Sequence, residues 1–207
     1  MTSPVQSFLP AAPRGWRGYA RFWAAFLAVL IADQTSKAWV RSHIEAGTYF
    51  SPPPIPVIDG FFYFVNVGNT GAAWSMFEHS TRWLALLGAV ALAAVYLFRR
   101  QLELRKPLLQ YTFGIMCGGI LGNLIDRSLH GSVVDFLDFH LPGYRYPAFN
   151  VADSGITVGV ILYLGYSFRD SWRGRRVAAR PTTPAPTPAA ENASTTSPAP
   201  TLKSAGR

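Results

Sequence analysis

Residues 108–127, LLQYTFGIMCGGILGNLIDR, are almost wholly apolar until the segment ends in an aspartate and an arginine. A helix of about 20 apolar residues is long enough to cross the hydrocarbon core of a bilayer. Three further apolar runs of similar length occur at 22–40, 83–98 and 151–168. The sequence therefore predicts an all-α membrane protein with four transmembrane helices.

The composition is also typical of a membrane protein. Only 14% of the 207 residues are charged, about half of the roughly 25% that is usual in soluble domains. The net charge of +8 gathers at the ends of the apolar runs and not on one face, which argues against nucleic acid as a partner. The single cysteine, Cys117, lies inside an apolar run, so we expect a packing role and no intrachain disulfide.

The first apolar run is flanked by arginines, as in a cleaved signal peptide, but no small-residue cleavage site follows it. We therefore expect an uncleaved helix.

The distribution of lysine and arginine predicts the orientation of the helices. Three segments are basic: the N-terminal segment, the connection between the second and third runs, and the segment after the fourth (Arg14, Arg17, Arg21; Arg99, Arg100, Arg105, Lys106; Arg169, Arg173, Arg175, Arg176, Arg180). The two longer connections carry fewer, mainly Arg41, Arg82 and Arg145. Because basic segments stay in the cytoplasm, both termini are expected there, and the longer connections face outward.

The first outward connection contains PPPIPVIDGFFYFVNV (52–67), in which two β-rich runs flank a tight-turn dipeptide, so a small hairpin or sheet is expected. TGAAWSMFEHS (70–80) is expected to form a short amphipathic element, with Trp74 suited to the membrane interface. We divide the chain into a cytoplasmic segment (1–20), a membrane domain (21–170) and a cytoplasmic tail (171–207). That tail is first basic and then rich in Pro, Ala and Thr, a composition typical of disorder.

Four aspartates are expected in the outer half of the membrane or just outside it. At a rise of about 1.5 Å per residue, Asp33 lies about 18 Å from the cytoplasmic side, Asp153 about 24 Å and Asp126 about 30 Å. Asp135 follows the third run in the outward connection. An acid in lipid costs about 2.5 to 3.5 kcal/mol, so these side chains should be paired, buried in the bundle or functional.

Several of these polar residues are spaced to interact. Asp33 and Lys37 are four residues apart and share a helix face, which favours a structural ion pair. Asn123 and Arg127 have the same spacing. Asp126 is expected to pair with Arg127 or Lys37.

Gly114, Gly118 and Gly122 form a stripe at four-residue spacing. Small residues in one stripe allow close helix packing, and this stripe should seat the acidic end of the third helix against its neighbours.

Asp135 and Asp153 are the remaining acids, and two carboxylates in one partly dry site cannot both ionise easily. Such a pair shares a proton, so it can both activate a water and protonate a leaving group. Proton relays and ion sites use the same residue types. The residues alone leave open a hydrolase, a small proton- or cation-coupled transporter, and a non-catalytic scaffold, although paired broken helices typical of transporters are not evident.

Five segments of the sequence resemble the lipoprotein signal peptidases, also called signal peptidase II. They are DQTSK (33–37), NTGAAWSMF (69–77), GGILGNLIDR (118–127), GSVVDFLDFH (131–140) and FNVADS (149–154). They occur in the order found in the family, and the resemblance covers about residues 20–170.

The resemblance implies an aspartic endopeptidase of the bacterial inner membrane, with its active site at the outer face. Its substrate is a prolipoprotein carrying a diacylglyceryl group, cut just before the lipidated cysteine. The family's catalytic dyad falls on Asp135 and Asp153. Its other polar residues fall on Asn69, Gly71, Asn123, Arg127 and Asn150, which would bind substrate or support the dyad, and on Asp33, Lys37 and Asp126, which would be structural.

The expected partners are the prolipoprotein and the lipid bilayer, and a monomer is expected. No cofactor is expected and no metal, because His130 and His140 lack a compact ligand spacing. Trp74 stands where the family usually has phenylalanine, which should affect fine specificity more than activity. Asp138, near the dyad, is expected to be a structural loop residue.

Overall fold

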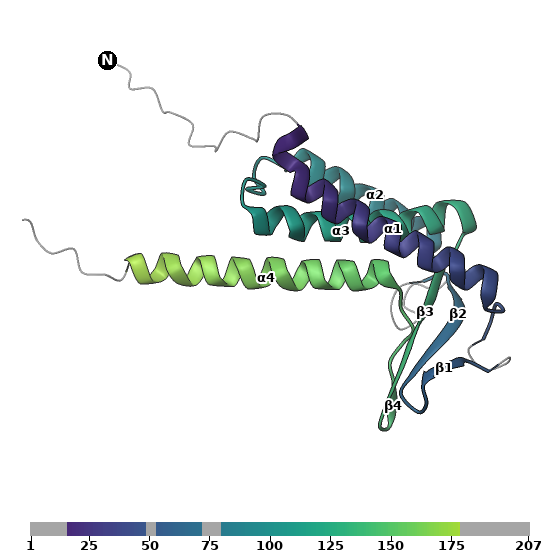
Figure 1. Ribbon diagram of the computed structural model, residues 1–207. Helices are drawn as coiled ribbons and strands as arrows, with labels where there is room; N and C mark the ends of the chain where they lie inside the picture. Colours follow the sequence, from purple (N-terminus) through teal and green to yellow (C-terminus); the bar gives the residue numbers. More distant parts are fainter. Residues whose placement is uncertain (1–15, 49–52, 72–79, 179–207) are drawn as a thin grey trace, which may run out of the picture. The chain divides into compact units, whose positions relative to one another are not determined.

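The computed structural model describes residues 16–48, 53–71 and 80–178, and these form four α-helices and one small antiparallel sheet (Figure 1). The helices are α1 (Ala20–His43), α2 (Thr81–Leu97), α3 (Pro107–His130) and α4 (Val151–Ala178), with a short 3-10 helix, η1 (Trp16–Tyr19), before α1. The strands are β1 (Ile55–Ile58), β2 (Phe62–Asn69), β3 (Val133–Leu141) and β4 (Tyr144–Arg145). The compact unit that holds the polar cluster ends at Phe168.

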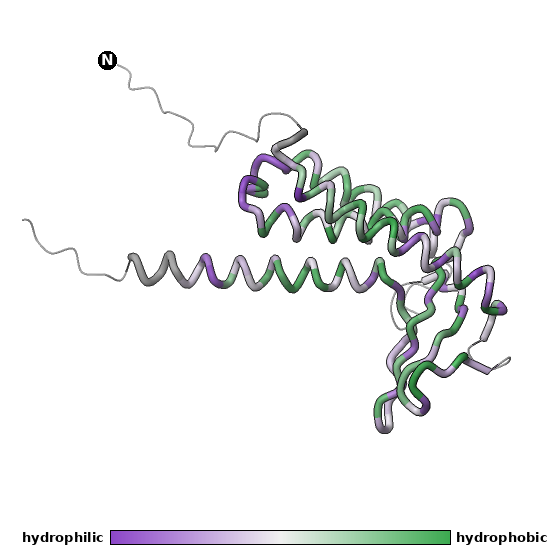
Figure 2. Tube along the Cα trace, in the orientation of Figure 1, coloured by the Kyte–Doolittle hydropathy of each residue, from purple (hydrophilic) through white to green (hydrophobic). Residues whose placement is uncertain are grey.

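The helices correspond to the four predicted apolar runs, but they differ in their apolar character (Figure 2). By length and composition, α3 and the Val151–Trp172 part of α4 could each cross a membrane, whereas α2 is a shorter apolar helix. Helix α1 is less apolar because it carries Asp33, Lys37 and Arg41 along its second half. The prediction of four helices is confirmed, and the prediction of four membrane spans stays a prediction.

Close packing of α3 depends on its glycines, as the stripe predicted. A Cβ at Gly114 would lie 2.5 Å from the carbonyl oxygen of Phe22 in α1, and one at Gly118 would lie 2.6 Å from that of Phe26. Such distances are shorter than van der Waals contact, so only glycine allows the two backbones to approach this closely.

The sheet has the order β1-β2-β3-β4 and lies at the C-terminal ends of α1 and α3 (Figure 1). The predicted hairpin is confirmed: β1 pairs antiparallel with β2 around a turn at Gly60, whose φ of +74° favours glycine. The sheet packs on α1, where Val40 and Ile44 contact Val134 and Phe136 in a buried apolar cluster.

Two segments differ from the sequence analysis. Asp135 and Asp138 were expected in the outward loop, but they lie in the strand β3, because this segment is rich in valine and phenylalanine and pairs with β2. Helix α4 continues past the predicted end at 168 to Ala178, through a segment whose arginines are good helix formers.

Two predictions fall outside the described residues. They are the amphipathic element over 72–79, which includes Trp74, and the tail beyond 178.

Replacement of Gly118 by alanine tests the packing of α3. We expect Gly118→Ala to lower the free energy of unfolding by about 1–3 kcal/mol, because the added methyl group overpacks the α1–α3 contact. The measurement is thermal unfolding in detergent micelles. Gly88→Ala in α2 is the matched control, since its Cβ would meet Ile120 at an ordinary 3.6 Å. Equal destabilisation by both changes would contradict the packing role.

Candidate active site

Asp135 and Asp153 are brought together by Asn150, which hydrogen-bonds to both. The Nδ2 of Asn150 donates to Oδ1 of Asp135 at 2.7 Å. Its backbone N–H donates to Oδ2 of Asp153 at 3.3 Å, and its Oδ1 accepts from the backbone N–H of Asp153 at 2.9 Å. Asn150 is fully buried. Asn150 therefore links Asp135 of β3 to Asp153 of α4. Its side-chain NH2 group binds the first residue, and its side-chain oxygen binds the second.

The position of Asp153 follows from the way α4 begins. Asn150 precedes the first helical residue, and asparagine is favoured at this N-cap position because its side chain accepts an otherwise unpaired N–H of the first turn. Asp153 is the third residue of the helix, and its carboxylate reaches back to the N-cap N–H. This reciprocal arrangement is a capping box. The helix dipole also favours a negative charge at this end.

Asn69 holds the other oxygen of Asp135. Its Nδ2 donates to Oδ2 of Asp135 at 2.8 Å, and its Oδ1 accepts from the backbone N–H of Gly71 at 2.8 Å. Because the amide oxygen is already bonded, the NH2 group is the side of the amide that faces the carboxylate.

Asn123 does the same for Asp153. Its Nδ2 donates to Oδ1 of Asp153 at 2.7 Å, and its Oδ1 accepts from Nζ of Lys37 at 2.9 Å. With Asn69 and Asn150, each of the four carboxylate oxygens of the two acids therefore receives a hydrogen bond from an asparagine. The two carboxylates are held in defined orientations by three amides from β2, α3 and the start of α4.

Lys37 is the centre of a buried polar cluster beside the two acids. Its Nζ lies 2.9 Å from Oδ2 of Asp33 and 2.8 Å from Oδ2 of Asp126, and all three side chains are inaccessible to solvent. The other oxygen of Asp126 accepts from Arg41 at 2.8 Å. Oδ1 of Asp33 accepts from the backbone N–H of Ala152 at 2.9 Å, which ties α1 to the first turn of α4.

The structure thus confirms the Asp33–Lys37 pair and selects Lys37 as a partner of Asp126. Arg127, the alternative partner, donates instead to the carbonyl oxygen of Gly71 at 3.0 Å. All ten site residues predicted from the sequence lie in the contacts described above, while their roles stay predictions.

The environment of Asp135 opposes ionisation. The side chain is buried, with 3% of the residue exposed. Burial, followed by the nearby carboxylate of Asp153, raises the pKa of Asp135 to about 7, although hydrogen bonds from Asn69 and Asn150 oppose the shift. A raised pKa lets Asp135 keep a proton closer to neutral pH than an ordinary carboxyl does, so the pair can both donate and accept a proton.

Sequence reasoning missed two polar residues that hold this region together. Arg41 was counted only for its charge, although it pairs with Asp126. Asn66 donates from Nδ2 to the carbonyl oxygen of Ile44 at 2.7 Å, which ties β2 to the end of α1. A polar side chain in the middle of an apolar strand pattern was the available signal for Asn66.

Asp138 is structural, as predicted, but it does not lie in a loop. It is a fully buried residue of β3. Its carboxylate pairs with Arg145 at 2.5 Å and lies 2.9 Å from Nε2 of His140. Over the described residues, 16–48, 53–71 and 80–178, no group of three or more His, Cys, Asp or Glu side chains is arranged to hold a metal ion.

A family model described as signal peptidase (SPase) II matches residues 25–169, which is more than half of the chain and includes all of these site residues. The chain belongs to the signal peptidase II family. A lipoprotein signal peptidase of Shewanella sp. (strain MR-4) is 41% identical over 167 residues, covering 77% of this chain and 93% of the relative. One of Geobacillus kaustophilus (strain HTA426) is 38% identical over 149 residues, covering 72% and 93%.

Two solved structures of bacterial membrane enzymes resemble the chain in fold. A bacterial membrane enzyme determined by the in meso method at 2.3 Å resolution is similar with a TM-score of 0.66 and 31% identity, covering 72% of this chain and 88% of that one. A second such structure, at 1.9 Å, has a TM-score of 0.63 and the same identity, covering 72% and 93%. The family member described here is therefore a membrane enzyme of the peptidase class.

Replacement of Lys37 tests whether the buried cluster is needed for the fold. Lys37→Met should lower the free energy of unfolding by about 3–5 kcal/mol, because Asp33 and Asp126 would lose a buried countercharge. Arg41→Met is the matched control and should cost less, since the Arg41 side chain is 29% exposed. Chemical unfolding in micelles measures both. A smaller loss for Lys37→Met than for Arg41→Met would show that the cluster does not depend on Lys37.

Proposed function

We propose that this protein is an aspartic endopeptidase that removes the signal peptide from diacylglyceryl-modified prolipoproteins by cutting just before the lipidated cysteine. The observation that carries the proposal is the joining of Asp135 and Asp153 through Asn150, with each carboxylate oxygen hydrogen-bonded by an asparagine. Family membership supports the substrate class, since the relatives are lipoprotein signal peptidases. It also argues against the alternative of a proton- or cation-coupled transporter.

We infer that the enzyme crosses the bacterial inner membrane four times, with both termini in the cytoplasm. Lysine and arginine counts at the helix ends support this orientation. It brings the cluster of acids to the outer face, where the scissile bond of a lipidated precursor must lie because its acyl chains stay in the bilayer. The substrate and the lipid bilayer are the proposed partners, and the proposed working unit is a monomer.

In the proposed reaction one proton is shared by the two aspartates. Asp153, at the N-terminus of α4, is the member best placed to remain ionised, and it takes a proton from a water as the oxygen attacks the carbonyl carbon before the cysteine. Asp135 carries the shared proton and donates it toward the carbonyl oxygen. When the C–N bond breaks, the proton taken up by Asp153 passes to the leaving amine and one hydroxyl of the tetrahedral intermediate returns its proton to Asp135. The pair is thereby restored, and one water is consumed per bond cut.

The supporting residues would act through the acids or on the substrate. Asn69, Asn123 and Asn150 would keep the two carboxylates facing each other, as their hydrogen bonds indicate. Arg127 would hold the connection at Gly71 beside the acids through its bond to that carbonyl.

Amide variants of the two aspartates test the dyad. Asp135→Asn and Asp153→Asn should each reduce cleavage by about a thousandfold or more, because each removes a group that transfers a proton. Cleavage of a diacylglyceryl-modified prolipoprotein by the enzyme in lipid vesicles is followed by gel shift. An unlipidated precursor should not be cut.

Asp59→Asn is the control for the dyad variants. Asp59 lies in the exposed β1–β2 turn. The Asp59→Asn variant should therefore cleave the substrate at the wild-type rate. Near-normal cleavage by either dyad variant would contradict the mechanism.

The pH dependence of cleavage tests the raised pKa of Asp135. Since its pKa is about 7 and the proposed acid must be protonated, kcat/KM should fall as pH rises above about 7. The hydrogen bond from Asn69 lowers the pKa of Asp135. Asn69→Ala should therefore move this alkaline limb to higher pH, whereas Asp59→Asn should leave it in place. A limb that stays fixed or moves lower in Asn69→Ala would exclude Asp135 as the titrating acid.

A further inference from the structure

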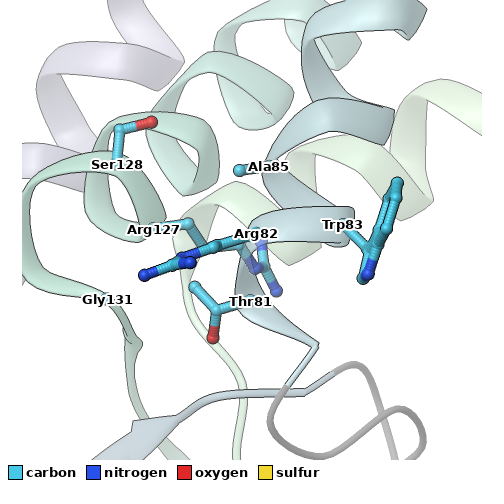
Figure 3. A pocket seen from close by; sticks show the side chains of 7 residues that line it. All are labelled: Thr81, Arg82, Trp83, Ala85, Arg127, Ser128 and Gly131. Atoms are coloured by element: carbon cyan, nitrogen blue, oxygen red, sulfur yellow. The ribbon is translucent and has the colours of Figure 1, made fainter.

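A hollow of about 740 Å³ lies between the N-terminal end of α2 and the C-terminal end of α3 (Figure 3). It is lined by Thr81, Arg82, Trp83, Ala85, Arg127, Ser128 and Gly131. Neither aspartate of the proposed dyad is among these residues, and Arg127 is the one lining residue that also lies beside the acids.

Among the described residues, 16–48, 53–71 and 80–178, the lining is cationic and includes no acid. Arg82 comes from α2 and Arg127 from α3, and Figure 3 shows both side chains at the same hollow. Two guanidinium groups that share one hollow repel each other, and an anion bound there would attract both. Phosphate is the anion whose oxygens best match guanidinium donors.

Both arginines retain unused donors. The Nε of Arg127 is buried and has no hydrogen-bond partner in the part of the chain that the structure describes. Arg82 is exposed and makes neither an ion pair nor a hydrogen bond with any described residue. Helix α2 begins at the hollow, has no side-chain cap and has no acid in its first turn. Its unpaired N–H groups and the positive end of its dipole add to the attraction for an anion.

The surroundings indicate that the anion is part of a lipid. Trp83 is 73% exposed, and Leu86 and Leu87 next along the helix are 52% and 64% exposed. No residue of α2 is buried. A tryptophan at the end of an exposed apolar helix is typical of the membrane interface, where phospholipid phosphates lie.

We propose that this hollow binds the phosphate of a membrane phospholipid, through Arg82 and Arg127, with the acyl chains along the exposed face of α2. The proposal rests on α2 crossing the membrane, as in the proposed function. It assigns to the start of α2 a lipid-binding role in addition to peptide cleavage.

Native mass spectrometry of the full chain in an uncharged detergent tests this proposal. Phosphatidylglycerol and diacylglycerol with the same acyl chains are titrated separately. We expect one phosphatidylglycerol to bind more tightly than diacylglycerol, and Arg82→Gln to weaken that binding by about tenfold, the effect of losing a hydrogen bond to a charged group. Arg82→Lys should weaken it less, since the charge remains but the planar fork of donors is lost.

Arg100→Gln is the matched control, because Arg100 is an exposed arginine just beyond the other end of α2. It should leave the tightly bound lipid in place. Binding to Arg82→Gln as strong as to the wild type, or equal binding of diacylglycerol, would overturn the proposal. Displacement of the lipid by millimolar inorganic phosphate would show that the site selects free phosphate instead.

The cleavage assay separates this proposal from the proposed function. Lipid counting does not require a working peptidase, so failure of cleavage would leave the lipid result intact. Normal lipid binding by Arg82→Gln, together with a raised KM for prolipoprotein, would assign the hollow to the substrate and overturn the lipid proposal.

Discussion

A lysine ammonium shielded from water is the constraint on which the rest of this structure depends. Lys37 cannot remain charged in the interior without countercharges, and Asp33 and Asp126 supply them from α1 and α3. The same carboxylate of Asp33 also accepts from the start of α4. Three helices, α1, α3 and α4, therefore meet at one ion cluster, which fixes how they are aligned along their axes. The glycines of α3 allow this meeting by bringing the backbones into contact.

The cluster determines the acidic pair through a short chain of hydrogen bonds. Lys37 engages the oxygen of Asn123, which leaves the NH2 group of that amide to face Asp153. At the other acid, the backbone of Gly71 engages Asn69 in the same way. When the oxygen of an asparagine side chain already accepts a hydrogen bond, its NH2 group must be the part that donates to the neighbouring carboxylate. The carboxylates of Asp135 and Asp153, which would otherwise repel each other, are thus held near one another by asparagine side chains.

Much of this arrangement could be predicted from the sequence where the signal is local. The apolar runs predicted the helices, the turn dipeptide at Asp59 predicted the β1–β2 hairpin, and four-residue spacing predicted the Asp33–Lys37 pair. Contacts between segments that are far apart in the sequence could not be predicted in this way. The pairing of Arg41 with Asp126 joins residues far apart in the chain, and spacing rules apply only within one helix.

The strand β3 was missed for a different reason. Its apolar residues follow directly on a long apolar helix, and its two aspartates and histidine interrupt the apolar–polar alternation that is typical of a strand. Pairing with β2 makes the strand, and that partner lies more than sixty residues earlier in the chain. By contrast, Asn150 just before α4 and Asp153 in its first turn form a capping box, which their three-residue spacing was sufficient to predict.

The exposure of α2 has a consequence for how this chain can change over time. No residue of α2 is fully buried, and Trp83, Leu86 and Leu87 are more than half exposed. In the proposed four-span arrangement these exposed side chains meet lipid and not other side chains. Lipid tails are fluid and fit any apolar shape, so leucine, valine, isoleucine and phenylalanine are nearly interchangeable there. Helix α3, whose glycines meet backbone atoms, has no such freedom. Sequence drift among homologous chains should therefore be fast along α2 and slow along α3.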